Sequence, residues 1–239
     1  MKVYCVTDKG MVRELNEDYY YLPSKGEHFA AVADGMGGHA AGEVASRMAI
    51  SAFTEALRKA GDDLSKETMK EAFDYANAAV FREAQRDSSK RGMGTTLTAI
   101  WYNARNVFLG HVGDSRAYRL RDGVLEQMTT DHSYVEELVQ SGVITREQAK
   151  NHPKRNIITR CIGCYPEVEA DLLKLERRDR DIWLLCSDGL VNYVNDDEIA
   201  EELKSEKPWE EKINSLKKTA LKRGGADNLT ILVAVGGKA

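Results

Sequence analysis

Four aspartates stand out because each lies beside a glycine or an asparagine at the end of an apolar run. They are Asp34, Asp114, Asp188 and Asp227. Such runs, stopped by Gly or Asp, are typical of strands that end in turns. A carboxylate at that position is held by a rigid element but faces a loop. Because Mg²⁺ and Mn²⁺ prefer oxygen ligands in near-octahedral geometry, the pattern predicts a multi-carboxylate metal centre that carries out hydrolysis.

A single Asp-Gly pair is weak evidence, because most such pairs only reverse the chain. Here four acids at strand ends are joined by the run Asn16-Glu17-Asp18 after the first predicted strand. Clustered carboxylates repel one another unless a cation neutralises them. The number of acids therefore favours a metal centre over a set of ordinary turns.

Hydrolysis of a phosphate ester needs a neutralised anion and a nucleophile made from water. Two ions roughly 3.5–4 Å apart supply both, since they bind phosphate oxygens and lower the pKa of the water between them. We expect Asp34, Asp188 and Asp227 to be the ligands. Asp34 is the expected bridge, and Gly35 allows its own backbone carbonyl to approach closely.

Two further side chains could act on the phosphate. Arg13 lies just ahead of the acidic run, and a guanidinium binds phosphate through two parallel hydrogen bonds, although a solvated surface arginine is the alternative. His39 ends the glycine-rich turn after Asp34 and could protonate the leaving oxygen near neutral pH. A metal ligand or a surface histidine is the competing interpretation of His39. The other histidines, at positions 28, 111, 132 and 152, are expected to be structural or surface residues.

The composition narrows the class of protein. The chain has 239 residues, 42% of them hydrophobic, and 34 basic against 38 acidic side chains give a net charge of −4. No long basic run is present, so nucleic acid is a poor candidate partner. No apolar stretch approaches a membrane span, and Met1–Thr7 is too short for the core of a signal peptide. We therefore expect a soluble cytoplasmic protein.

Two of the four cysteines form a CxxC pair, Cys161 and Cys164. Structural zinc normally needs a second pair, and a thioredoxin-like motif should lie between a strand and a helix, whereas a Tyr-Pro turn follows here. We expect reduced thiols without a function at this pair.

Periodicity predicts an α+β fold in one domain, residues 1–239. The hairpin turn at Asp122-Gly123 and other short connections favour antiparallel sheets, and the helices come in adjacent pairs, as two helical layers over a double sheet require. Expected strands cover residues 2–7, 18–22, 28–34, 95–102, 107–112, 116–121, 124–128, 168–175, 181–187 and 228–235. Expected helices cover residues 42–59, 66–86, 133–141, 196–204 and 208–222, with a short one opening at Thr145.

Six ordered motifs resemble those of the PPM family of metal-dependent protein phosphatases (type 2C), most closely its bacterial branch. They begin with Thr7-Asp8-x-Gly10-x-x-Arg13-x-x-Asn16-Glu17-Asp18 and Ala33-Asp34-Gly35-Met36-Gly37-Gly38-His39-x-x-Gly42. The others are Gly92-Met93-Gly94-Thr95-Thr96, Val112-Gly113-Asp114-Ser115-Arg116, Cys186-Ser187-Asp188-Gly189-Leu190 and Gly225-Ala226-Asp227-Asn228-Leu229-Thr230. Together they span nearly the whole chain.

The resemblance implies a four-layer α-β-β-α sandwich of two antiparallel sheets flanked by helix pairs. It implies two core Mn²⁺ or Mg²⁺ ions, bridged by Asp34 and completed by the Gly35 carbonyl, Asp188 and Asp227. It further implies that Asp18 and Glu17 act through bound water, that Asn228 supports the ligands, and that Asp114 and Asp188 hold a third, weaker ion. Arg13 would bind phosphate, His39 would be the acid, and residues 131–166 would form a mobile flap beside the cleft.

The expected function is hydrolysis of phosphoserine and phosphothreonine in proteins, by a monomer that opposes a serine/threonine kinase of the same bacterium. A non-catalytic binding module on this fold would be expected to lack some metal acids, and all are present. A phosphatase dedicated to one regulatory switch would be expected to carry a sensor domain, for which the chain leaves no room. The flap is expected to select phosphoproteins, with a fixed surface excursion as the alternative.

Overall fold

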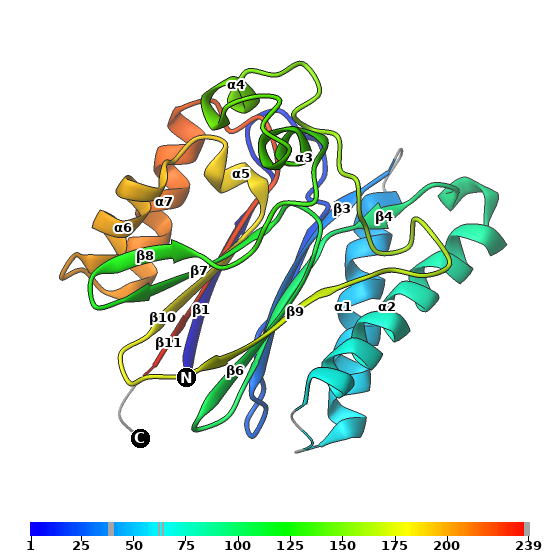
Figure 1. The fold of residues 1–239 in the computed structure, drawn as a ribbon, viewed down its shortest axis with the longest axis horizontal. Coiled ribbons are helices and arrows are strands. Elements are labelled where there is room, and N and C mark those ends of the chain that lie inside the picture. The colour runs from blue at the N-terminus through cyan, green and yellow to red at the C-terminus, as the bar shows by residue number, and fades with distance from the viewer. Residues whose placement is uncertain (38–40, 62, 64, 237–239) are drawn as a thin grey trace.

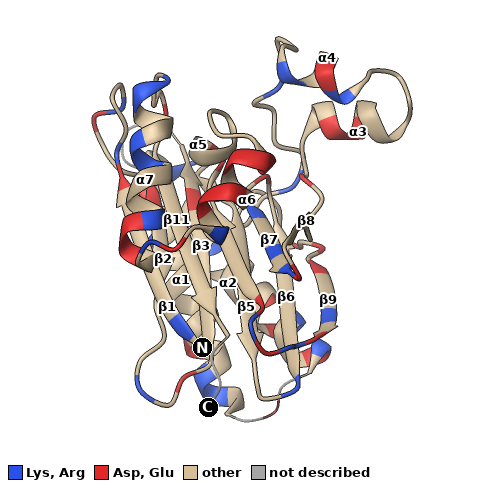
Figure 2. Cartoon of the chain, turned by 90° about the vertical axis from the view of Figure 1, so that its left-hand side faces the viewer, with Lys and Arg blue, Asp and Glu red and all other residues tan. Residues whose placement is uncertain are grey.

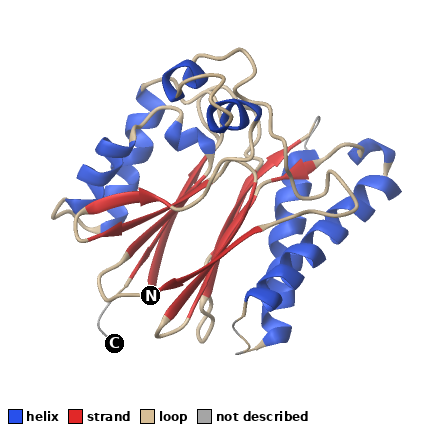
Figure 3. Cartoon of the chain, viewed as in Figure 1, coloured by secondary structure: helices blue, strands red, loops and turns tan. Residues whose placement is uncertain are grey.

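Two β-sheets pack face to face between two layers of helices, as the computed structural model of the chain shows (Figures 1 and 3). The structure describes residues 1–37, 41–61, 63 and 65–236. The expected four-layer sandwich is confirmed. It follows from the sequence pattern, because each sheet has two apolar faces and each helix has one, and four layers bury all of them.

One sheet has the strand order β1-β11-β10-β7-β8, and the other has the order β2-β3-β5-β6-β9, with β4 pairing to β3. All these pairs are antiparallel. The strands are β1 (Lys2–Asp8), β2 (Asp18–Tyr21), β3 (Phe29–Met36), β4 (Gly94–Thr95), β5 (Leu97–Tyr102), β6 (Asn106–Val112), β7 (Arg116–Arg121), β8 (Val124–Gln127), β9 (Asp171–Glu176), β10 (Ile182–Cys186) and β11 (Leu229–Val235).

The long helices α1 and α2 cover the sheet that contains β3, and α6 and α7 cover the other sheet (Figure 1). The helices are α1 (Ala41–Ala60), α2 (Lys66–Arg86), α3 (Tyr134–Gln140), α4 (Arg146–Lys150), α5 (Asp188–Val191), α6 (Asp196–Lys204) and α7 (Trp209–Lys222), with a 3₁₀ turn, η1, at Ser88–Lys90. Within the part of the chain that is described, no helix is both long and apolar enough to cross a membrane.

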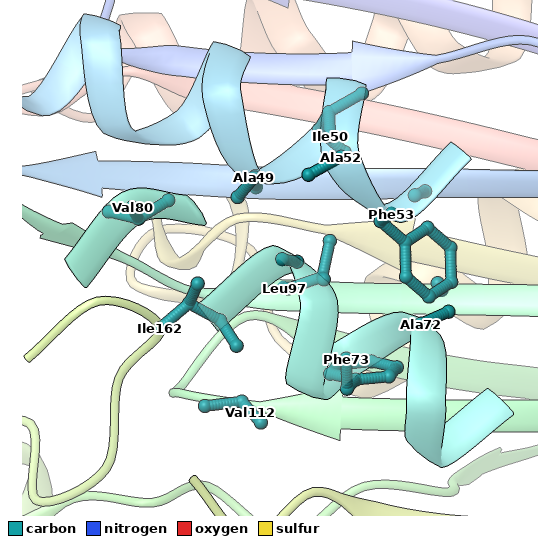
Figure 4. Close-up of a cluster of buried hydrophobic side chains, with 14 of the residues drawn as sticks. Ala49, Ile50, Ala52, Phe53, Ala72, Phe73, Val80, Leu97, Val112 and Ile162 are labelled. Carbon is teal, nitrogen blue, oxygen red and sulfur yellow. The ribbon is translucent and has the colours of Figure 1, made fainter. Parts of the chain in front are cut away.

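The core has three apolar layers. One lies between the sheets, where Val32 and Ile100 meet Leu185 and Leu232. A second apolar layer lies between the helices α6 and α7 and the sheet that contains β10 and β11. The third lies under α1 and α2, where Phe53 and Phe73 pack edge to face with ring centroids 5.2 Å apart (Figure 4). Rigid packing on both sides of each sheet holds the strand ends in place.

Most predicted elements occur within a few residues of the predicted bounds. Asp122 and Gly123 both have positive φ, at 50° and 81°, as the predicted primed turn requires. Thr145 and Asn195 each complete a capping box. The sequence did not predict α5, since Asp188 was expected in a turn after a strand and is instead the first residue of this one-turn helix.

The expectation of two reduced thiols in the CxxC pair was wrong. The structure joins Cys161 and Cys164 in a disulfide, with their Cα atoms 5.7 Å apart. Ile162 and Gly163 between them form a bridge and a turn that bring the two side chains together. This separation is ordinary for a disulfide. The sequence could not show that the chain turns back on itself here.

Candidate metal centre

The strand directions bring five aspartates to one end of the sandwich. In an antiparallel pair, the start of one strand lies beside the end of its neighbour. Asp18 opens β2 directly opposite Asp34 near the end of β3. Asp188 follows the end of β10, and Asp227 precedes the start of β11, which pairs with β10. Asp114 follows β6. The acids that are dispersed in the sequence therefore converge across both sheets.

Asp18 and Asp34 are in register across the β2–β3 pair, so their side chains leave the same face of the sheet. Like charges directly opposite each other destabilise a sheet. Asp18 is also buried, with 6% of its surface exposed, whereas Asp34, Asp114, Asp188 and Asp227 keep part of their surface open. The cluster of aspartates is thus buried in the protein on one side and exposed to solvent on the other.

The pKa values of these groups reflect first their burial and then their crowding. Burial, followed by repulsion from the other aspartates, raises the pKa of Asp34 well above its ordinary value of 3.8. Burial and the Asp188 carboxylate do the same to the pKa of Asp114. Burial raises the pKa of Asp18 to about 7 and that of Asp188 to about 6. The site therefore favours either protons or cations.

Two carboxylate oxygens indicate that the site binds cations rather than protons. Asp18 Oδ1 and Asp188 Oδ1 are buried and have no hydrogen-bond partner among the described residues. Buried polar atoms are almost always paired, so such oxygens point to a missing partner. No three His, Cys, Asp or Glu side chains in the described ranges are grouped closely enough to hold an ion by themselves. The two unpartnered carboxylate oxygens fit Mg²⁺ or Mn²⁺, because these ions prefer oxygen ligands.

The predicted carbonyl ligand, Gly35, lies where only glycine fits. A Cβ on Gly35 would collide with the Gly42 carbonyl oxygen and lie 2.7 Å from that of Glu17. The Glu17 carboxylate in turn accepts a hydrogen bond from the Gly42 amide at 3.1 Å, in the first turn of α1. Burial raises the pKa of Glu17. His39, the predicted acid, lies outside the described residues.

Arg13 reaches the cluster from the loop between β1 and β2. Its guanidinium Nη2 donates to Asp227 Oδ2 at 2.9 Å, and half of its side chain is exposed. This hydrogen bond raises the pKa of Arg13, and Glu17 and Asp34 add to the effect. A fully charged, partly exposed guanidinium beside the acids is suited to receive a phosphate from solvent.

Asn228 fixes the loop that carries Arg13. Its Nδ2 donates to the carbonyl oxygens of Lys9 and Leu15 at 2.9 and 2.8 Å, and its Oδ1 accepts from the Glu17 amide at 2.8 Å. Three bonds from one amide thus pin both ends of the segment that presents Arg13. Only Asn or Gln offers this combination of donors and acceptor.

Buried hydroxyl groups position the aspartates. The residues that carry them belong to the sequence motifs, but the motifs did not reveal this role. Ser187 donates to Asp18 Oδ2 at 2.7 Å and accepts from the Thr230 amide at 2.9 Å. Thr96 Oγ1 accepts from the Asp34 amide, and Thr95 Oγ1 donates to the Asp34 carbonyl, both at 2.8 Å. The available signal was the place of these hydroxyl residues in the motifs, with Ser187 directly before Asp188 and Thr95-Thr96 in a motif of their own.

A cleft of about 830 Å³ opens beside Asp114, Asp188 and Asp227 and runs under the predicted flap. The helices α3 and α4 lie beyond the ends of the sheets and carry residues of both charges (Figure 2). Charged side chains of both signs line the cleft. The root of the flap is rigidly held, because Arg116 binds Asp131 through Nε at 2.9 Å and Nη2 at 2.7 Å, and Arg160 binds Asp171 at 2.8 Å.

Comparison with known proteins assigns the chain to a family. The family described as protein phosphatase 2C matches residues 12–232. The chain is 44% identical over 230 residues to the serine/threonine protein phosphatase PstP of Mycobacterium tuberculosis, and 39% identical over 233 residues to the serine/threonine phosphatase stp of Listeria monocytogenes. These alignments cover 95% of the chain, but 43% of PstP and 92% of stp. The chain thus spans less than half of the mycobacterial relative.

Solved structures of similar proteins support the same family assignment. The crystal structure of M. tuberculosis PstP/Ppp superimposes with a TM-score of 0.92 at 42% identity and covers 99% of both chains. The catalytic domain of PstP in complex with two manganese ions gives 0.87 at 40% identity, covering 99% of this chain and 98% of that one. The chain therefore belongs to the protein phosphatase 2C family, of PPM type, and the predicted family and fold are confirmed.

The raised pKa values predict how pH acts on the metal-free protein. The pKa of Asp18 is about 7 in the folded protein, above the ordinary value of 3.8. A carboxyl group whose pKa is raised by folding stabilises the folded state fully below about pH 4. This stabilisation is lost as the pH rises through the folded-state pKa, which for Asp18 means towards pH 7. In the presence of EDTA, Asp18→Asn should therefore gain stability relative to the unchanged chain as pH rises from 4 to 7. Urea unfolding at each pH measures this.

The matched control is Asp122→Asn, in an exposed hairpin turn at the opposite end of β7. Its free energy of unfolding should run parallel to that of the unchanged chain at every pH. If the Asp18→Asn curve also runs parallel, the burial and crowding of Asp18 have no energetic consequence and the electrostatic description is wrong.

Proposed function

We propose that this protein hydrolyses phosphoserine and phosphothreonine in proteins, using Mn²⁺ or Mg²⁺. The observation that carries the proposal is the convergence of five aspartates at one end of the sandwich, beside an exposed arginine. Two of them have unpartnered oxygens, and Asp114, Asp188 and Asp227 line a cleft. Family membership and the manganese-bound PstP domain support it. Bound ions would supply charge neutralisation and a water of lowered pKa.

The residues of the chain have distinct proposed roles. Asp34 would be the ligand shared by two ions, and the Gly35 carbonyl, Asp188 and Asp227 would complete the direct ligands. Asp18 and Glu17 act through water, and the unpartnered Asp18 Oδ1 is available for such a bond. Asp114 shares a third, weaker ion with Asp188, and both line the cleft.

Arg13 is proposed to hold the phosphate. It can turn from Asp227 towards a substrate because half of its side chain is exposed. Asn228 keeps its loop in place. His39 is proposed, from its position in the sequence, to protonate the leaving oxygen. The flap, residues 131–166, is proposed to contact the phosphoprotein around the phosphorylated residue, because α3 and α4 form one wall of the cleft.

The wider setting follows from these proposals. The substrates are phosphoproteins that a serine/threonine kinase of the same bacterium produces, and that kinase is a candidate substrate. Residues 1–239 act as a single, monomeric phosphatase domain in the cytoplasm. The named bacterial relatives are serine/threonine phosphatases, which supports this setting.

The metal roles predict graded losses. Asp34→Ala and Asp188→Ala should each abolish measurable hydrolysis while leaving a folded protein, because a shared ligand serves more than one ion. Asp114→Ala should lower activity less, by roughly 10- to 100-fold, as expected for a ligand at the edge of the centre. Hydrolysis of p-nitrophenyl phosphate at saturating Mn²⁺ and circular dichroism are measured together. Near-normal turnover of Asp34→Ala would exclude the two-ion assignment.

Kinetics with two substrates separate the remaining roles. Arg13→Ala should mainly raise KM for both p-nitrophenyl phosphate and a phosphoprotein, since Arg13 meets a charge already present in the ground state. His39→Ala should mainly lower kcat, by about 10²-fold or more for the phosphoprotein, because general acids contribute on this scale. The aryl phosphate, whose leaving group needs little protonation, should be less affected.

In the flap, Arg155 lines the cleft. Its neighbour Lys154 instead lies over the Tyr134 ring, with Nζ 5.1 Å from the centroid. Arg155→Ala should lower kcat/KM for the phosphoprotein by about fivefold or less, as expected for one exposed charge, and leave the aryl phosphate unchanged. Lys154→Ala is the control and should change neither. Equal shifts with both substrates would show that the flap does not select substrates.

A further inference from the structure

The disulfide between Cys161 and Cys164 has no part in the function proposed so far. It closes a loop of only two intervening residues. A disulfide stabilises a fold mainly by restricting the unfolded chain, and this restriction is smallest for short loops. A role as a staple for the whole domain is therefore weak, and the local contacts of the two sulfurs decide what the bond can do.

Of the two residues between the cysteines, Ile162 is anchored in two directions. Ile162 is fully buried beside Val80 and Leu97 in the layer under α1 and α2 (Figure 4). Its backbone pairs with Thr95, with N–H···O distances of 3.0 Å and 2.8 Å in the two directions. The disulfide loop therefore forms an outer partner for the short strand β4 (Gly94–Thr95).

The sulfur atoms of the disulfide pack against β4. A Cβ on Gly94 would lie 2.7 Å from Cys164 Sγ and 3.5 Å from Cys161 Sγ, so the backbone of β4 packs directly against the bonded pair. On its other side, β4 pairs with Gly35 and Met36 at the end of β3. One two-residue strand thus lies between the disulfide and the predicted carbonyl ligand.

From β4 the contacts continue to Asp34. Thr95 Oγ1 and the Thr96 amide donate to the Asp34 carbonyl at 2.8 and 2.9 Å, and the Asp34 amide donates to Thr96 Oγ1 at 2.8 Å. These bonds hold the backbone of the proposed bridging ligand on both sides. The disulfide loop is therefore connected to Asp34 through two successive sets of hydrogen bonds, from Ile162 to Thr95 and from Thr95 and Thr96 to Asp34.

We propose that Cys161 and Cys164 form a reversible thiol–disulfide switch that sets the metal affinity of the centre; the inference rests on the function proposed above. Cys164 is half-buried and Cys161 is 8% exposed, so a small or protein dithiol can reach the Cys164 sulfur. A thiolate of this dithiol attacks Cys164 Sγ, and Cys161 leaves as a thiolate that takes a proton from water. The second thiol of the reductant resolves the mixed disulfide, which leaves two protein thiols and one oxidised dithiol.

Reduction changes the shape of the loop, because two thiol sulfurs cannot approach as closely as two bonded ones. The Gly94 backbone lies so close to the disulfide that a Cβ there would be 2.7 Å from Cys164 Sγ, so separation of the two sulfurs displaces β4 or the loop. Either movement weakens the Thr95–Ile162 pairing and the bonds that position Asp34. The oxidised form is the tight metal-binding form, and the reduced form needs more metal to reach the same activity.

The test compares the oxidised protein with protein reduced by dithiothreitol, which is then removed. Mass spectrometry after alkylation counts the thiols of Cys161 and Cys164. Hydrogen exchange without metal should be faster on reduction in the peptides that contain Thr95 and Ile162. The Mn²⁺ concentration for half-maximal hydrolysis of p-nitrophenyl phosphate should rise roughly tenfold, as when outer support of a metal ligand is lost, while kcat at saturating Mn²⁺ changes little.

Two variants make the result specific. Cys161→Ser/Cys164→Ser should behave as the reduced protein and ignore dithiothreitol, whereas Cys5→Ser, in β1, should respond as the unchanged chain does. Equal hydrogen exchange and equal Mn²⁺ dependence in the two redox forms would overturn the switch, and so would a failure to reduce the bond in the folded protein. If no form hydrolyses the substrate at any Mn²⁺ concentration, the proposed function fails, and hydrogen exchange alone then decides on the switch.

Discussion

Repulsion among five carboxylates at one end of the sandwich is the constraint on which the rest of the structure depends. Asp18 and Asp34 face each other in register, and Asp188 and Asp227 flank the neighbouring strands of the other sheet. Neither sheet could hold these charges by itself, because the ends of both are needed to bring them together. A fold that accepts this cost in the absence of metal gains from any divalent cation that removes it.

The surroundings of the acids are arranged to keep them in place without neutralising them. Ser187 and Thr96 bind Asp18 and the backbone of Asp34, and Asn228 fixes the loop of Arg13. Apart from Arg13, these partners are uncharged, so they orient the carboxylates and leave their negative charge available to a cation. The packed layers on either side of each sheet make the strand ends rigid, which is what a preorganised centre requires.

Much of this could be predicted from the sequence, because the strongest signals are local. Glycine, asparagine and aspartate mark the ends of apolar runs, and helix periodicity and caps fix the helices closely. What escaped prediction depends on partners distant in the sequence. The bond from Ser187 to Asp18 joins residues 169 positions apart. The helix that begins at Asp188 is a single turn, too short for periodicity to reveal. The disulfide depends on a turn at Ile162 and Gly163 that the CxxC spacing alone does not specify.

The central claim is that Asp18, Asp34, Asp114 and Asp188 are partly protonated without metal and that the centre binds divalent cations by giving up those protons. Calorimetric titration of the metal-free protein with Mn²⁺ at pH 6, in buffers of different ionisation enthalpy, counts the protons released. Because burial raises the pKa of Asp18 to about 7 and that of Asp188 to about 6, with Asp34 and Asp114 also raised, the account predicts release of about one proton or more per protein. Binding heats that are the same in every buffer would mean that no protons leave and would contradict it.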